Sequence, residues 1–250
     1  MSELALPGAS SSPAVGTRRI RRVGHKGADL IAPGNTYASF DAALEAGVDM
    51  IEFDVLRLLH EDRLILAHDY RDAARRVPPT LEEGLAYLAA EAFEGVEIDV
   101  DLKLPGYELL VLDALREHGL LDRAIISSQY RSSLALIRSA EPGVRLGWSV
   151  PKLRRDPFRS RLLRLPAVLA GLVARSVLPA LAQRALARGA CDALMVQWRL
   201  VTPRLVRSVR AAGGELYVWT VDDAERLREF ERLGVTGVIT NDPRLFGDKT

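Results

Sequence analysis

From Arg21 onward, short apolar runs rich in valine and isoleucine alternate with longer stretches of helical periodicity. This alternation is typical of repeated strand–helix units whose strands pair in parallel, and it predicts an α/β fold. The runs predict eight strands, over Arg22–His25, Met50–Leu56, Val96–Leu102, Ala124–Ser128, Arg145–Val150, Leu194–Gln197, Leu216–Thr220 and Gly237–Thr240. The longer stretches predict helices over Thr36–Ala46, Thr80–Ala90, Tyr107–Glu117, Thr202–Ala212 and Asp222–Arg232.

One apolar run breaks the alternation. Leu64–His68 follows the second strand after only a short polar segment, whereas parallel neighbours need a crossover of a dozen or more residues. We therefore expect it to return antiparallel as a β-hairpin extension of the second strand, with His68 beside Glu52. Eight parallel strands plus a hairpin in 250 residues predict a (β/α)8 TIM barrel. A doubly wound open sheet is the alternative, but no G-x-G-x-x-G fingerprint follows the first strand.

Composition sets limits on partners and location. With 34 Lys+Arg against 33 Asp+Glu, the net charge of +1 gives no strong field, so we expect no nucleic-acid partner. The single cysteine, Cys191, excludes an intramolecular disulfide and fits a cytoplasmic location. Residues 1–17 are rich in Ser, Ala, Pro and Gly and lack the regions of a signal peptide, so a disordered leader is expected before a single domain over residues 18–250. The oligomeric state is not predicted.

Polar residues stand at the ends of several predicted strands, where packing alone would favour apolar ones. His25 ends the first strand, and His68 ends the hairpin. Two further pairs each share one face of a strand by the period of two, and they are Glu52 with Asp54 and Asp101 with Lys103. In a TIM barrel such residues converge at the carboxyl ends of the strands, where reactive groups gather.

These residue types favour hydrolytic chemistry on a charged substrate. Three carboxylates supply the hard oxygen ligands that Mg²⁺ or Ca²⁺ prefers, whereas a zinc site would call for Cys or several His residues. A lysine beside them would bind an anion such as a phosphate. Two histidines can share the acid and base roles near neutral pH. For the deeper acids Glu97 and Asp99 we expect a structural role, with Arg21 as a candidate partner.

The motifs resemble those of the glycerophosphodiester phosphodiesterase family. They are His25-Lys26-Gly27, Pro33-Gly34-Asn35-Thr36, Ile51-Glu52-Phe53-Asp54-Val55, Ala67-His68-Asp69, Pro79-Thr80-Leu81-Glu82-Glu83, Asp101-Leu102-Lys103, Tyr217-Val218-Trp219-Thr220-Val221 and Gly237-Val238-Ile239-Thr240-Asn241-Asp242-Pro243. The motifs follow one another in the family's order along most of the chain.

This resemblance implies a barrel enzyme of lipid metabolism that uses a divalent metal, magnesium or calcium, to cleave glycerophosphodiesters to glycerol 3-phosphate and an alcohol. By the same resemblance, Glu52, Asp54 and Asp101 are the metal ligands, and His25 and His68 are the catalytic pair. Lys26 and Lys103 would neutralise the phosphoryl charge, and Trp219 would form an apolar wall for the leaving group.

The sequence also departs from the family's pattern. Lys26 replaces an Arg, Gly34 replaces a Glu, and Asp101 replaces a longer Glu. The segment between His68-Asp69 and Pro79 is short and lacks the usual insertion, so a more open site is expected. Two alternatives follow, a lysophospholipase D-like enzyme acting on lysophospholipids at the membrane surface, and a non-catalytic barrel that binds phospholipids or phosphometabolites.

The segment over residues 152–190 is too long for an ordinary barrel helix. Between Asp156 and Asp192 it has six arginines and no acid, in a setting rich in Leu, Val and Ala. Its longest uncharged stretch is far short of the roughly 20 residues that span a bilayer. Pro166 and Pro179 are expected to divide it into at least two helical pieces. Residues 157–188 therefore predict either a solvated helical insertion or a peripheral membrane contact.

Overall fold

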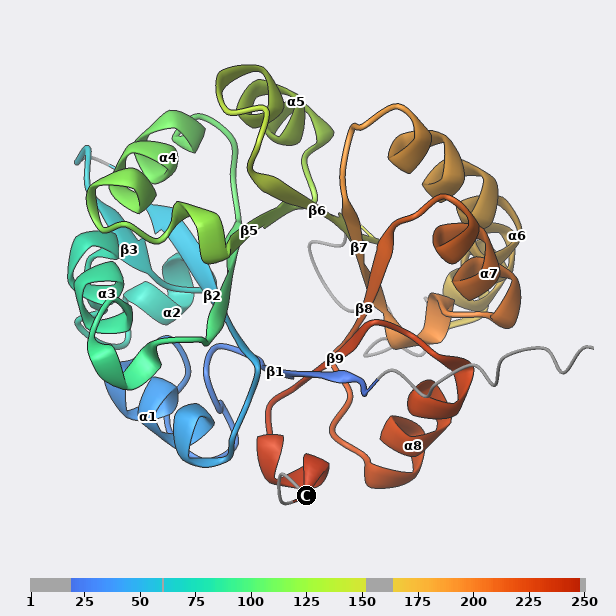
Figure 1. Ribbon diagram of the computed structural model, residues 1–250, viewed down its shortest axis with the longest axis horizontal. Coiled ribbons are helices and arrows are strands. Elements are labelled where there is room, and N and C mark those ends of the chain that lie inside the picture. Colours follow the sequence, from blue (N-terminus) through green and yellow to red (C-terminus); the bar gives the residue numbers. More distant parts are fainter. Residues whose placement is uncertain (1–18, 60, 152–163, 248–250) are drawn as a thin grey trace, which may run out of the picture.

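The computed structural model describes residues 19–59, 61–151 and 164–247, and in these the predicted (β/α)8 barrel is confirmed (Figure 1). The strands are β1 (Arg21–Gly24), β2 (Met50–Arg57), β3 (Leu64–Leu66), β4 (Glu97–Leu102), β5 (Ala124–Ser128), β6 (Arg145–Val150), β7 (Ala193–Gln197), β8 (Glu215–Trp219) and β9 (Gly237–Thr240). Eight of them pair in parallel in the order β1-β9-β8-β7-β6-β5-β4-β2, and pairing of β1 with β2 closes the barrel. The leader predicted over residues 1–17 lies outside the described residues, and the single domain over 18–250 stays a prediction.

The remaining strand, β3, forms the predicted hairpin. It pairs antiparallel with β2, from Val55 opposite Leu66 to Arg57 opposite Leu64. Because β3 ends at Leu66, His68 lies outside the paired residues of the hairpin. The predicted pairing of His68 with Glu52 is therefore not formed.

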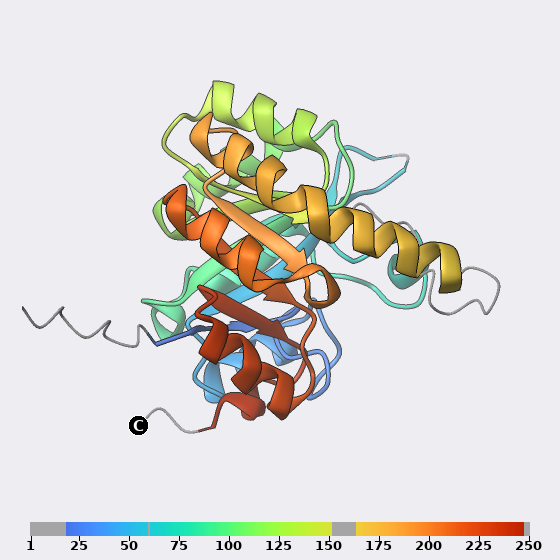
Figure 2. The same ribbon diagram turned by 90° about the vertical axis from the view of Figure 1, so that its right-hand side faces the viewer.

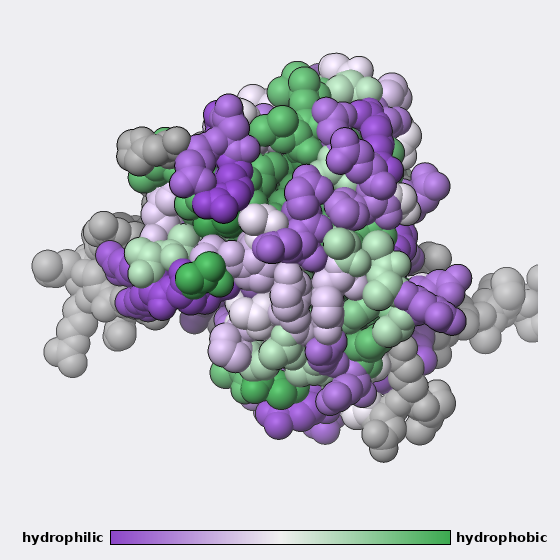
Figure 3. Space-filling view, turned by 90° about the vertical axis from the view of Figure 1, so that its left-hand side faces the viewer, coloured by the Kyte–Doolittle hydropathy of each residue, from purple (hydrophilic) through white to green (hydrophobic). Residues whose placement is uncertain are grey.

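A layer of helices surrounds the barrel. The α-helices are α1 (Tyr37–Glu45), α2 (Tyr70–Ala73), α3 (Leu81–Leu88), α4 (Glu108–Glu117), α5 (Arg131–Ala140), α6 (Arg164–Ala187), α7 (Pro203–Ala211) and α8 (Ala224–Leu233). Hydroxyl and carboxylate side chains cap four of the five predicted helices, α1, α3, α7 and α8, as with the capping box of Thr80 and Glu83. Helices α4 and α5 begin without a side-chain cap, and α5 is a helix that the sequence analysis did not predict. Figure 3 shows the face of this layer that is on the left in Figure 1, where hydrophilic side chains alternate with hydrophobic patches.

Within the described residues, helix α6 runs without interruption from Arg164 to Ala187, so Pro179 does not divide the segment as predicted. The predicted segment before Arg164 lies outside the described residues. Pro166 lies in its first turn, where a backbone N–H has no partner within the helix to lose. Pro179 lies inside the helix, and the turns around it are fixed by burial of Leu178 and Ala182 against the barrel. Packing therefore outweighs the cost of one lost backbone hydrogen bond.

The barrel interior changes in character from one end to the other. At the amino ends of the strands, Arg21 and Arg145 both form ion pairs with Glu97, and Arg145 also binds Glu215 at 2.7 Å. This confirms Arg21 as a partner of Glu97. An apolar layer follows, made of Val23, Met50, Ile125, Ala193, Met195, Tyr217 and Ile239. The acid cluster lies at the carboxyl ends, beyond this layer. Asp99 of β4 lies between the two groups of charges, since Arg145 of the ion-pair network still acts to lower its pKa.

Candidate active site

Three carboxylates from two adjacent strands meet at the carboxyl end of the barrel. Asp54 of β2 lies opposite Asp101 of β4 in the sheet, and Glu52 lies one inward-facing position deeper on β2. Each offers an oxygen atom, and the three atoms lie within 4.8 Å of one another. Glu52 and Asp54 are buried, whereas Asp101 is partly accessible. The parallel register thus brings together the three residues predicted as metal ligands.

Lys103 lies among these carboxylates. Its ammonium group forms ion pairs with Asp54 Oδ1 and Asp101 Oδ2. Burial alone would lower the pKa of Lys103, but the adjacent carboxylates of Asp101, Asp54 and Glu52 raise it well above its ordinary value. The lysine therefore stays charged and provides a fixed cation at the barrel mouth.

The acid cluster has coordination capacity that the described residues leave unused. Asp101 Oδ1 is buried and accepts no hydrogen bond from the described part of the chain, and Asp54 Oδ1 is contacted there by Lys103 without accepting a hydrogen bond. Buried carboxylate oxygens normally have partners. Oxygen donors converging within a few ångströms fit a hard divalent cation.

The pKa values show the same crowding of negative charge. Burial and the neighbouring Asp54 raise the pKa of Glu52 well above its ordinary value. Burial and Asp101 raise the pKa of Asp99, one position deeper on β4, to about 8. Burial opposes ionisation of Asp54 as well, but Lys103 and His68 outweigh it and lower the Asp54 pKa. The cluster thus has more carboxyl groups than its lysines neutralise.

The loop between β1 and α1 fixes this cluster from one side. The backbone N–H of Lys26 donates to Glu52 Oε2 at 2.8 Å. Buried Asn35 donates to Asp54 Oδ2 at 2.8 Å and accepts from the Asp54 backbone N–H at 3.0 Å. Lys26 and Asn35 both adopt positive φ angles, 51° and 59°, which place these groups toward β2. Asn35 was not predicted as a site residue, because an amide has no charge to single it out.

Asp29 and Gly34 explain one departure from the family's pattern. Asp29 pairs with the Lys26 ammonium at 3.1 Å and accepts from the Gly34 backbone N–H at 2.9 Å. A Cβ atom at Gly34 would lie 2.6 Å from Asp29 Oδ1 and 2.8 Å from Lys26 Cβ. The carboxylate of Asp29 therefore requires a residue without a side chain at position 34.

His25 is held from its outer side by residues after β9. Its Nδ1 atom lies 2.5 Å from Asn241 Oδ1, and the Asn241 amide donates to Asp222 Oδ2 at 2.7 Å. Because the Asn241 nitrogen faces Asp222, its oxygen faces His25, and His25 Nδ1 must be the donor. The Nε2 atom then has a free lone pair and lies 3.9 Å from Glu52 Oε2. Burial and Lys26 lower the His25 pKa to about 4.

His68 occupies a more accessible position. Its side chain is 52% exposed, and its Nδ1 atom lies 3.7 Å from Asp69 Oδ2. Its backbone N–H donates to Asp72, which also binds Arg76 at 3.0 Å, and Arg76 donates in turn to the Leu66 carbonyl. The short segment after β3 is therefore ordered by its own hydrogen bonds and leaves His68 at an open mouth.

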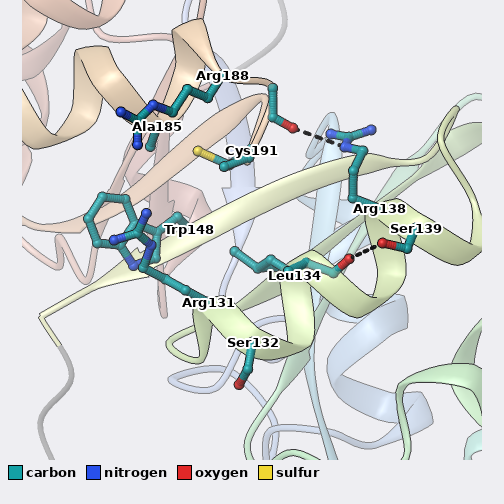
Figure 4. A pocket seen from close by; sticks show the side chains of 12 residues that line it. Arg131, Ser132, Leu134, Arg138, Ser139, Trp148, Ala185, Arg188 and Cys191 are labelled. Carbon is teal, nitrogen blue, oxygen red and sulfur yellow. Dashed lines mark hydrogen bonds between the residues drawn. The ribbon is translucent and has the colours of Figure 1, made fainter.

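The tryptophans divide between the site and the outer layer. Trp219 ends β8 and packs against the apolar layer inside the barrel. Trp148 faces outward, and its ring centroid lies 5.1 Å from Cζ of Arg131 on α5. Both residues line a cavity of about 560 Å³ between α5 and α6 (Figure 4). Trp198 contacts Arg199 and Arg226. Of the three, Trp219 is the one that borders the barrel mouth from inside.

Comparison with known proteins agrees with this geometry. Residues 25–83 and 108–245 match the model of the glycerophosphoryl diester phosphodiesterase family. A glycerophosphodiester phosphodiesterase of Caldanaerobacter subterraneus is 26% identical over 254 residues, which cover 88% of this chain and 93% of the relative.

Solved structures show the same fold. A phosphodiesterase of Oleispira antarctica, solved in complex with its product sn-glycerol-3-phosphate, superposes with a TM-score of 0.67 at 19% identity and covers 90% of this chain and 94% of its own. A glycerophosphodiester phosphodiesterase of Parabacteroides distasonis has a TM-score of 0.67 at 18% identity, with the same coverages of 90% and 94%.

Proposed function

The chain belongs to the glycerophosphoryl diester phosphodiesterase family, and from this premise we propose that it hydrolyses glycerophosphodiesters to glycerol 3-phosphate and an alcohol. The observation that carries the proposal is the convergence of Glu52, Asp54, Asp101 and Lys103 at the carboxyl end of the barrel. Both predicted histidines border the same mouth. A barrel that only binds phosphometabolites would not need a paired proton acceptor and donor, and lysophospholipase D activity is not favoured by the names of the relatives.

We propose that Glu52, Asp54 and Asp101 hold a divalent cation, Mg²⁺ or Ca²⁺. When bound, such a cation supplies a Lewis acid for a phosphoryl oxygen. Lys103, already fixed between two of the ligands, neutralises further charge on the phosphoryl group, and Lys26 does so from the β1–α1 loop. The apolar ring of Trp219 borders the leaving group.

We propose that His25 is the general base and His68 the general acid. Nε2 of His25 has a free lone pair on the side of the acid cluster, which suits the removal of a proton from the attacking hydroxyl group. The exposed His68 lies at the mouth, where a leaving alcohol departs into solvent and must gain a proton.

The test is an assay with glycerophosphocholine that detects glycerol 3-phosphate. We expect activity with Mg²⁺ or Ca²⁺, loss of activity in EDTA, and a decrease of orders of magnitude in Asp54→Asn. That variant should also lose any rise in Tm that the metal gives the parent protein. Full activity after exhaustive dialysis against EDTA would exclude the metal role.

The described residues include no helix that is long and apolar enough to cross a membrane. We propose, as an extension of the enzymatic function, a cytoplasmic location and a peripheral membrane contact through residues 157–188, of which the structure describes 164–188. The exposed apolar side chains of α6 support the contact.

A further inference from the structure

Exposed large apolar side chains gather at the end of the barrel that bears the acid cluster. Leu30 and Ile31 lie in the loop after β1, Leu59 in the turn after β2, and Val77 in the segment after α2. Leu30 is 61% exposed, Leu59 66% and Val77 98%. Leu30, Ile31 and Leu59 follow the carboxyl ends of β1 and β2. Val77 follows Arg76, which donates to the Asn35 carbonyl in the β1–α1 loop. Single exposed apolar side chains are ordinary, so it is their shared position at one end of the barrel that indicates an interaction surface.

Helix α6 adds a larger apolar surface at the same end. Figure 2 shows that its first half extends past the barrel on the side toward which the strands point. In its second half, Ala182 and Leu186 are buried against the barrel. Val168 lies on the same helix face as these two residues but is about half exposed, as are Leu172 and Val173. The first half therefore has apolar side chains without barrel beneath them.

The charge of this segment favours an anionic partner. No acidic residue occurs between Asp156 and Asp192. Arg175, at the end of the first half of α6, is exposed and donates to the Arg199 carbonyl at 2.7 Å, and Arg184 is exposed in the second half. Apolar side chains flanked by arginines are the composition with which a helix lies in the interface of an anionic membrane.

We propose that the carboxyl end of the barrel, together with the first half of α6, docks on an anionic lipid surface, so that the acid cluster opens toward the lipid headgroups. The apolar residues lie on separate segments, on the β1–α1 loop, the hairpin and α6, rather than on one continuous patch. A fluid interface can receive such separate anchors, whereas a folded partner would need a matching rigid surface. The inference rests on the proposed function for its biological meaning, because phospholipid headgroups contain the same glycerophosphodiester unit as the soluble substrate proposed above.

The experiment is sedimentation of the full chain with phosphatidylcholine vesicles that contain phosphatidylglycerol. We expect the parent protein to bind these vesicles and to bind them less at high salt. For Leu172→Asp and for Val77→Asp, we expect the vesicle–water partition coefficient to fall at least tenfold. Leu136→Asp is the matched control, because Leu136 is 45% exposed on α5, away from the mouth, and Leu172 is 52% exposed on α6. The control should bind vesicles like the parent protein.

The proposal would be overturned if the parent protein did not bind vesicles, or if Leu136→Asp lost as much vesicle binding as the mouth variants. It would also be overturned if light scattering showed a parent dimer that Leu172→Asp converts to a monomer, without any vesicle binding. Hydrolysis of soluble glycerophosphocholine should be unchanged in Leu172→Asp and in Val77→Asp, because neither residue contacts the acid cluster. If vesicles bind as expected while glycerophosphocholine is not hydrolysed, the docking stands and the proposed substrate fails.

Discussion

Two asparagine side chains hold the charged residues of the site in place. Asn35 fixes the Asp54 carboxylate, and Asn241 fixes the His25 ring. The charged residues of the site were predictable because titratable groups at strand ends are conspicuous in a sequence. The two amides were not, since their importance depends on contacts with β2 and β1 that exist only once the barrel closes.

Removal of the Asn241 amide should disturb catalysis without weakening substrate binding. In Asn241→Leu the His25 ring loses the acceptor for its Nδ1 proton, so both ring tautomers become accessible. We expect kcat to fall on the order of 10 to 10²-fold with KM little changed, as for other residues that orient a reacting group. The NMR shifts of the His25 ring nitrogens should show mixed tautomers. In a His25→Ala background the same substitution should have little further effect, and an additive loss would contradict the positioning role.

The raised pKa of Asp99 predicts a decrease of stability with increasing pH. The folded protein binds a proton at Asp99 up to about pH 8, whereas an unfolded aspartate releases it near pH 4. The folded state therefore binds more protons between these values, and its stability falls as the pH rises through them. Asp99→Asn should lack this decrease, so urea unfolding should show its advantage over the parent protein growing from pH 5 to pH 8. If the free energy of unfolding of Asp99→Asn exceeded that of the parent protein by the same amount at pH 5 and pH 8, the pKa of Asp99 would not lie between these values.

At the scale of elements, the sequence predicted the strands better than the helices. Strands were recognisable because buried Val and Ile runs are bounded by turns, and their ends shifted by at most one residue, except in the hairpin, where β3 ends two residues early. Helix α5 lacked an N-cap side chain, and α6 contained prolines that suggested interruption. Both helices are determined by packing against the barrel, which local sequence does not show.

The β1–α1 loop yields a prediction about Gly34. Restoring the family's residue with Gly34→Glu should reduce activity rather than raise it, because the new side chain would collide with Asp29 and Lys26. We expect the loss to appear in both kcat and KM for glycerophosphocholine. The double variant Asp29→Gly/Gly34→Glu removes one of the two contacts, leaving that with Lys26, and should recover part of the activity. If Gly34→Glu alone were as active as the parent protein, the loop would accommodate a side chain at position 34, and the prediction would be wrong.

For the whole molecule, the barrel was predictable from the alternation of strands and helices and from their number. The convergence of the acids was predictable as well, because parallel strands present their carboxyl ends on one side. The ordering of the mouth was not: Asp29, Arg76 and Asp222 act through loop conformations that have no sequence period.

The ion-pair network at the amino ends of the strands should support stability rather than activity. Arg145→Met leaves Glu97 and Glu215 half-buried with less compensation, which should cost about 2–4 kcal/mol in the free energy of unfolding, less than for a fully buried pair. Denaturant titration measures this loss. Activity of the folded variant below its transition should match that of the parent protein, because the apolar layer lies between the network and the acid cluster. A large loss of kcat with unchanged stability would reverse this assignment.

The apolar layer inside the barrel thus has a consequence for engineering. Because it lies between most of the ion-pair network and the acid cluster, mutagenesis libraries confined to the loops at the mouth can explore new substrates while a separate selection at the opposite end raises heat tolerance. Gains from the two campaigns should combine in one chain with little interference.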